Sequence, residues 1–163
     1  MTRRRKVFSG GPFEEIVGYS RAVAAGDFIF VSGCTSIVDG EVAHVGDMTR
    51  QAEQAILIAG QALAGLGASL ADVVQTRMYV TDITRWREVA EAHRLAFADV
   101  VPAASMVQVA ALIDPRLLVE VEVVAHRAGG PNADEGDAEE PGAAGPRPDE
   151  FRIDDESGVD ESA

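Results

Sequence analysis

Residues Leu117–Ala125 read Leu-Leu-Val-Glu-Val-Glu-Val-Val-Ala, and this stretch decides the fold. The period of two predicts a β-strand with valines on one face and two carboxylates, Glu120 and Glu122, on the other. The valine face suits a hydrophobic core. The carboxylate face cannot be a simple core face, because burying unpaired charges is costly. We therefore expect that face to line solvent, an oligomer seam or a pocket.

The segments before this strand predict a mixed α+β domain. Further strands are expected at Val17–Ala24, Phe28–Ser32, Thr35–Val38, Val73–Thr81 and Ser105–Leu112. Asp47 is a suitable N-cap for a long amphipathic helix, and a second helix is expected over Thr84–Ala98. The order β-β-(β)-α-β-α-β-β predicts an α+β two-layer domain, with two helices packed on one face of a mixed sheet.

The negative charge is concentrated at one end of the chain. The 163 residues carry a formal net charge of −13, and 12 of the 27 acidic side chains lie in residues 129–163. This segment, rich in proline and glycine, cannot bury enough apolar surface to fold, so we predict a disordered, solubilising tail. Its apolar island, Phe151–Ile153, offers the alternative of a docking segment for a partner. We divide the chain into an extension (1–16), a folded domain (17–128) and the acidic tail (129–163).

Composition argues against several classes of protein. The acidic balance disfavours a nucleic-acid backbone binder, which needs clustered cations. No apolar run approaches the roughly 20 residues that span a bilayer. The basic residues Arg3–Lys6 are not followed by the apolar core of a signal peptide, so we expect a cytoplasmic protein with no membrane or nucleic-acid partner.

The cysteine and histidine residues indicate structural roles. Cys34 is the single cysteine, which excludes an intramolecular disulfide and favours a small buried thiol. We expect His93 to be a half-buried core histidine, because it shares an apolar helical stripe with Trp86 and Phe97. The histidines are scattered without ligand spacing, so we predict no metal and no other cofactor.

Several short motifs, in order and with matching spacing, resemble the RidA/YjgF family between about Gly18 and His126. They are Gly18-Tyr-Ser20, Phe30-Val-Ser-Gly33, Val73-Val-Gln-Thr-Arg-Met-Tyr-Val-Thr-Asp82, Pro102-Ala-Ala-Ser-Met-Val-Gln-Val-Ala110 and Leu118-Val-Glu-Val-Glu122. The resemblance implies a chorismate-mutase-like fold and a homotrimer. It also implies that the sheets close around the threefold axis and that small-molecule clefts lie at the subunit seams.

The resemblance further implies a chemistry. Catalytic members hydrolyse reactive enamines and imines, such as 2-aminoacrylate and its 2-imino acid tautomer, to 2-oxo acids and ammonia. A glutamate positions water, an arginine pairs with the substrate carboxylate, a tyrosine shapes the cleft, and a Ser-Gly turn supplies polar contacts. Carried over by position, the glutamate is Glu120, the tyrosine is Tyr19 and the turn is Ser32-Gly33.

The arginine does not carry over. Where the catalytic form has Pro-x-Arg-Ser, this chain has Pro102-Ala-Ala-Ser105, so Ala104 occupies the arginine's place. We hypothesise that Arg21 or Arg77 points into the seam and pairs with Glu120, Glu122 or an anionic ligand. The alternative is an intersubunit salt bridge without a ligand role.

Taken together, the sequence predicts a RidA-like hydrolase acting on a reactive imine, an enamine or a related small metabolite. The predicted catalytic residue is Glu120, and the predicted ligand-binding residues are Tyr19, Ser32, Gly33, Ala104, Ser105, Arg21 and Arg77. A non-catalytic trimer that binds a small ligand or a partner is the alternative. A ribonuclease is the weakest reading, because the chain is acidic and shows no paired catalytic histidines.

Overall fold

The computed structural model describes residues 4–127. Its elements follow the chain as β1 Arg5–Val7, α1 Pro12–Val17, β2 Ala22–Ala25, β3 Phe28–Thr35, β4 Ile37–Val38, β5 Glu41–Val42, α2 Met48–Ala64, β6 Val73–Val80, α3 Trp86–Ala96, β7 Ala103–Gln108 and β8 Val119–His126. Single 3-10 turns at Leu70–Asp72 and Ile83–Arg85 precede β6 and α3. The predicted acidic tail, with its Phe151–Ile153 segment, lies outside the described residues.

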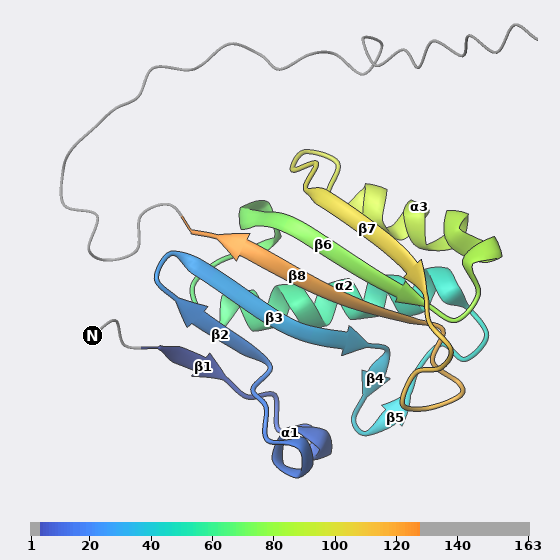
Figure 1. Cartoon of the computed structure of the whole chain (residues 1–163), viewed down its shortest axis with the longest axis horizontal. Helices are drawn as coiled ribbons and strands as arrows, with labels where there is room; N and C mark the ends of the chain where they lie inside the picture. The colour runs from blue at the N-terminus through green and yellow to red at the C-terminus, as the bar shows by residue number, and fades with distance from the viewer. Residues whose placement is uncertain (1–3, 128–163) are drawn as a thin grey trace, which may run out of the picture. The chain divides into compact units, whose positions relative to one another are not determined.

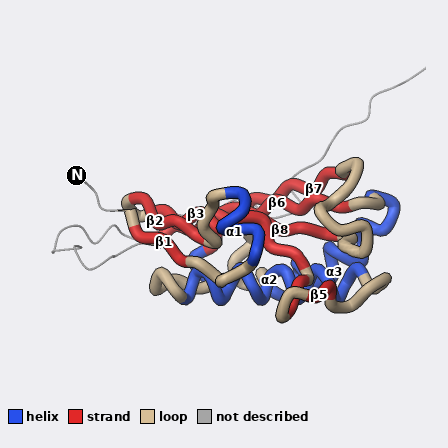
Figure 2. Tube along the Cα trace, turned by 90° about the horizontal axis from the view of Figure 1, so that it is seen from below, coloured by secondary structure: helices blue, strands red, loops and turns tan. Residues whose placement is uncertain are grey.

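Six strands form one mixed sheet in the order β1-β2-β3-β8-β6-β7 (Figure 1). Most neighbours are antiparallel, but β6 and β7 run parallel and are joined by the crossover helix α3. Helices α2 and α3 lie on one side of the sheet, as Figure 2 shows. This confirms the predicted α+β class. The other side of the sheet, here called the open face, is covered by neither α2 nor α3.

The core lies between the sheet and the two helices. Val119, Val121 and Val123 of β8 are buried there, as their alternation predicts. Asp47 caps α2 by accepting a hydrogen bond from the backbone N–H of Arg50, which confirms the predicted start of that helix. The buried Gln51 accepts from the backbone N–H of Leu118 and donates to the carbonyl of Arg116, which ties the entry of β8 to α2.

The N-terminal part differs from the expectation. A single strand over Val17–Ala24 is wrong, because Val17 ends α1 and Gly18, at φ 82°, turns the chain before β2 begins at Ala22. The expected extension also contains ordered elements. Its β1 pairs with β2 and adds an edge strand to the sheet. Proline at the start of α1 and glycine at its end are helix boundary signals that the strand reading overlooked.

The second helix also begins later than expected. The residues before it form a separate 3-10 turn, Ile83–Arg85, and α3 runs from Trp86 to Ala96. Trp86 was placed in the buried stripe, yet 43% of its surface is exposed. Its indole stacks under the guanidinium of Arg87 instead.

Candidate functional site

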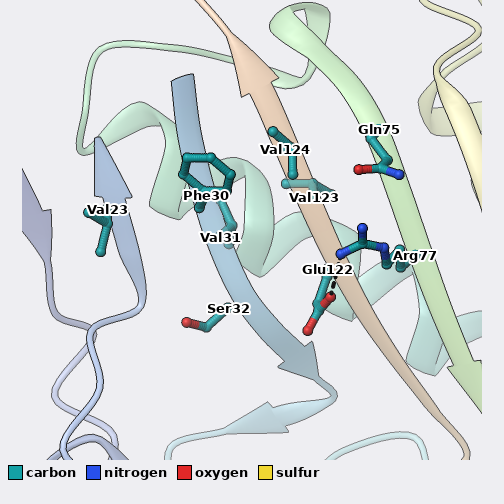
Figure 3. A pocket seen from close by; sticks show the side chains of 9 residues that line it. All are labelled: Val23, Phe30, Val31, Ser32, Gln75, Arg77, Glu122, Val123 and Val124. Carbon is teal, nitrogen blue, oxygen red and sulfur yellow. Dashed lines mark ion pairs between the residues drawn. The ribbon is translucent and has the colours of Figure 1, made fainter. Parts of the chain in front are cut away.

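Four neighbouring strands line a hollow of about 250 Å³ on the open face (Figure 3). Its polar side chains are Ser32 from β3, Glu122 from β8, and Gln75 and Arg77 from β6. Val23, Phe30 and Val124 supply apolar contacts. The hollow therefore offers a cation, a carboxylate and two neutral polar groups beside apolar surface. This is the mixture typical of small-molecule sites.

Glu120 lies against the glycine of the Ser32-Gly33 turn. Pairing between β3 and β8 shifts register between Val31 and Cys34, and this irregularity brings the Gly33 backbone under the Glu120 side chain. A Cβ on residue 33 would overlap the Glu120 carboxylate. An added side chain at position 33 would displace the Glu120 carboxylate, so glycine is what allows the carboxylate to lie here.

The Glu120 carboxyl group has an altered electrostatic environment. Its burial raises the pKa, and the neighbouring Glu122 charge raises it further, whereas the Arg21 guanidinium lowers it. The net direction is upward from the ordinary value. A half-buried carboxylate with a raised pKa is a stronger base than a solvated one, which suits the activation of water.

Arg21 lies at the same end of the open face as Glu120. It forms its ion pair with Glu14, however, whose Oε1 is 3.5 Å from Nε of Arg21. Its Nη1 donates to the Gly33 carbonyl at 2.6 Å, and its Nη2 donates to the Tyr19 hydroxyl at 2.9 Å. Tyr19, Arg21 and Gly33 thus form one hydrogen-bonded group beside Glu120. Glu14 was not singled out by sequence reasoning.

Arg77 lies farther along the open face. Its Nη1 is 3.8 Å from Oε2 of Glu122, and the Tyr79 hydroxyl donates to the same oxygen at 3.1 Å (Figure 3 shows the ion pair). Burial and the bond to Glu122 raise the pKa of Tyr79. Tyr79 was not among the predicted site residues. The alternation that places Arg77 on this face also places Tyr79 there.

Within one chain, Ala104 and Glu120 do not meet. Ala104 of β7 pairs with Thr76, whose buried side chain faces the helices, so Ala104 is on the helix side of the sheet. Ser105 pairs with Arg77 and lies on the open face. Strand β6 separates both residues from β8, which carries Glu120.

Two predicted structural residues have the expected surroundings. Cys34 is buried, its thiol donates to the Ser32 carbonyl at 3.2 Å, and burial raises its pKa to about 11. His93 is half-buried, and its Nε2 is 2.9 Å from the Thr76 hydroxyl. Neither fits a nucleophile or a general base at the open face.

Residues 4–127 contain no cluster of three or more His, Cys, Asp or Glu side chains that could hold a metal ion. None of the helices in this range has the length and apolar character needed to cross a membrane.

A mixed six-stranded sheet, backed by two helices and carrying carboxylates on its open face, defines an α+β protein with the chorismate-mutase-like fold. The sequence profile of the endoribonuclease L-PSP family matches residues 12–127. The chain therefore belongs to this family, which is the YjgF/RidA family that its motifs resemble.

Individual relatives agree with this assignment. An uncharacterized protein of Streptomyces coelicolor is 37% identical over 123 residues, which are 76% of this chain and 92% of that protein. Reactive intermediate deaminase A of Arabidopsis thaliana chloroplasts is 31% identical over 108 residues, covering 66% of this chain and 57% of that protein. The crystal structure of Rv2704, a Mycobacterium tuberculosis member of the YjgF/YER057c/UK114 family, is 49% identical with a TM-score of 0.70 and covers 76% of this chain and 99% of that one.

Proposed function

We propose that this protein hydrolyses a reactive imine, or the enamine that tautomerises to it, to a carbonyl compound and ammonia. The observation that carries the proposal is the Glu120 carboxylate lying on Gly33, half-buried and beside Tyr19 and Arg21. The relationship to a reactive intermediate deaminase supports it. The burial of Glu120 supports a role as base.

In the proposed reaction, Glu120 takes a proton from a water molecule as the water oxygen attacks the imine carbon. Glu120 then passes this proton to the nitrogen, which gives a carbinolamine. The carbinolamine expels ammonia as its C–N bond breaks, the C=O bond forms, and the hydroxyl proton moves to the leaving nitrogen. The overall change is R₂C=NH + H₂O → R₂C=O + NH₃. Ser32 and the Gly33 backbone contribute polar contacts at this end of the sheet.

The proposed mechanism also needs a cation that binds the substrate. Alanine at position 104 cannot pair with a carboxylate, and Arg21 is engaged by Glu14, Gly33 and Tyr19. Arg77 is about half exposed and lines the hollow, so we assign it as the non-standard anchor. In the homotrimer that we propose, Ala104 and Ser105 of one subunit would approach the Glu120 end of the next across a seam.

A second candidate function is non-catalytic binding of a small metabolite or a partner by the same trimer. Ala104 favours it, because losing one bidentate contact to a carboxylate removes about 2–5 kcal/mol of binding free energy.

The deciding experiment measures ammonia release from 2-iminopropionate, which an amino-acid oxidase generates in the assay. Wild type is compared with Glu120→Gln, Ala104→Arg and the control Glu53→Gln, which alters an exposed carboxylate on α2. We expect wild type and Glu53→Gln to accelerate release and Glu120→Gln to abolish the acceleration. If wild type is inert but Ala104→Arg is active, the cleft is intact and the binding function is the correct one.

A further inference from the structure

A buried ion pair next to the site has no role in the reaction described above. Glu14 of α1 is 6% exposed, and its carboxylate accepts hydrogen bonds from the Ser9 backbone N–H, the Ser9 hydroxyl and the Gly10 N–H. Burial raises its pKa, but the bonds from Ser9 and Gly10 and the charge of Arg21 outweigh this, so the pKa is lowered. Glu14 is therefore a fixed anion.

Arg21 is the cation that this anion fixes. Its side chain is 12% exposed, and each of its three nitrogens faces a different group. Nε lies 3.5 Å from Glu14, Nη1 donates to the Gly33 carbonyl, and Nη2 donates to the Tyr19 hydroxyl. A planar guanidinium holds such partners in one fixed arrangement, which the single ammonium group of lysine cannot reproduce. Because the Arg21 side chain is 12% exposed and two of its nitrogens already donate within the chain, it is poorly placed to bind a substrate carboxylate.

We infer that Arg21, fixed by Glu14, is a positioning residue for Glu120: it holds the Gly33 peptide on which Glu120 lies, orients the Tyr19 phenol, and supplies a positive charge to the carboxylate. The inference depends on the proposed function only because it takes Glu120 as the catalytic base. It assigns to Arg21 and Glu14 a role that differs from ligand binding.

The electrostatic part of this role has a defined sign. Glu122 on the same strand raises the pKa of Glu120, and Arg21 lowers it. Cys34 on β3 and Tyr79 on β6 also interact with Glu120, and both have raised pKa values, so they are neutral at pH 7. Arg21 is therefore the group that opposes the upward effect of burial and of Glu122 on the pKa of Glu120. Removing the guanidinium should raise the pKa of Glu120 and leave less of the base form at a given pH.

The test follows the Glu120 carboxyl carbon by NMR titration of the full chain, with Glu120→Gln used to assign its signal. We compare wild type, Arg21→Gln, Arg21→Lys and the control Arg85→Gln, which removes the arginine of a surface ion pair with Glu88. In Arg21→Gln the Glu120 midpoint should move to higher pH. In Arg21→Lys it should stay near that of wild type, because the charge is kept, and Arg85→Gln should match wild type.

The same variants are assayed for ammonia release across pH. Arg21→Gln should lose about 10- to 100-fold in kcat at neutral pH, with a smaller change in KM, and its acidic limb should shift to higher pH. Arg21→Lys should lose kcat without that shift, because lysine cannot hold Gly33 and Tyr19 together. An unchanged Glu120 midpoint and an unchanged pH profile in Arg21→Gln would overturn the inference.

Two further outcomes separate this inference from the proposed function. If wild type releases no more ammonia than Glu120→Gln, the proposed function fails, and the NMR titration still decides the role of Arg21. If Arg21→Gln does not fold, Arg21→Lys decides it. Wild-type kcat in that variant would show that the bonds to Gly33 and Tyr19 do not position the base.

Discussion

At the scale of single residues, the site depends on a glycine, Gly33, whose lack of a side chain leaves room for Glu120. Glu120 can lie on the sheet only because residue 33 has no Cβ. The contact is made by the far end of a flexible glutamate side chain, so the carboxylate can move away if the space is filled. Position 33 therefore controls the placement of the base more than the stability of the fold.

We predict that Gly33→Ala removes the ammonia-releasing activity while lowering the free energy of unfolding by about 1 kcal/mol or less, because only a side-chain end must shift. Activity assays and urea denaturation measure the two effects. Gly60→Ala is the matched control. Gly60 lies within α2, and an added Cβ would meet the Leu70 side chain at ordinary contact distance. Gly60→Ala should therefore raise the free energy of unfolding by about 0.5–1 kcal/mol and leave activity unchanged. Full activity in Gly33→Ala would show that the position of Glu120 on Gly33 does not matter.

The residues of this group were unequally predictable. Alternation placed Glu120 on the face opposite the core, and the family motifs pointed to Tyr19 and Gly33. Glu14 has no such signal. It is the first of two adjacent glutamates in a six-residue helix, and only the tertiary fold determines that Glu14 is buried while Glu15 is exposed.

At the scale of elements, α3 and β6 are joined by a polar contact inside an apolar interface. Thr76 is fully buried and meets the half-buried His93 at 2.9 Å. Burial lowers the pKa of His93, which favours its neutral form in the folded protein. The apolar periodicity of α3 was enough to predict a core histidine. The partner was not predictable, because Thr76 lies on a strand whose register with α3 depends on the crossover.

This contact predicts a pH dependence of stability. The folded-state pKa of His93 lies below its unfolded value of about 6.5, so its contribution is complete above that pH and is lost as the pH falls below it. The free energy of unfolding, measured by urea denaturation, should fall between pH 7.5 and 5.5. The fall should be smaller in His93→Gln and unchanged in His44→Asn, which replaces an exposed histidine. Equal slopes in wild type and His93→Gln would contradict the prediction.

At the scale of the whole molecule, the open face of the sheet carries more apolar surface than a solvated face needs. Phe28 and Phe30 are 44% and 50% exposed, and their rings lie 6.4 Å apart between centroids. They share this face with Glu122 and with the hollow at Arg77. An apolar patch rimmed by charged groups is typical of an interface between proteins. The homotrimer that we propose would cover it.

We predict that Phe30→Glu dissociates the assembly, because it adds a carboxylate to a face that already carries Glu120 and Glu122. Light scattering should give wild type a mass near three times 17.2 kDa and the variant a mass near one chain. Leu57→Glu, which alters an exposed leucine of α2, is the control and should stay assembled. Ammonia release should disappear with the assembly, because one chain places Ala104 and Ser105 away from Glu120. A monomeric wild type, or an active monomeric Phe30→Glu, would show that the site does not need a second subunit.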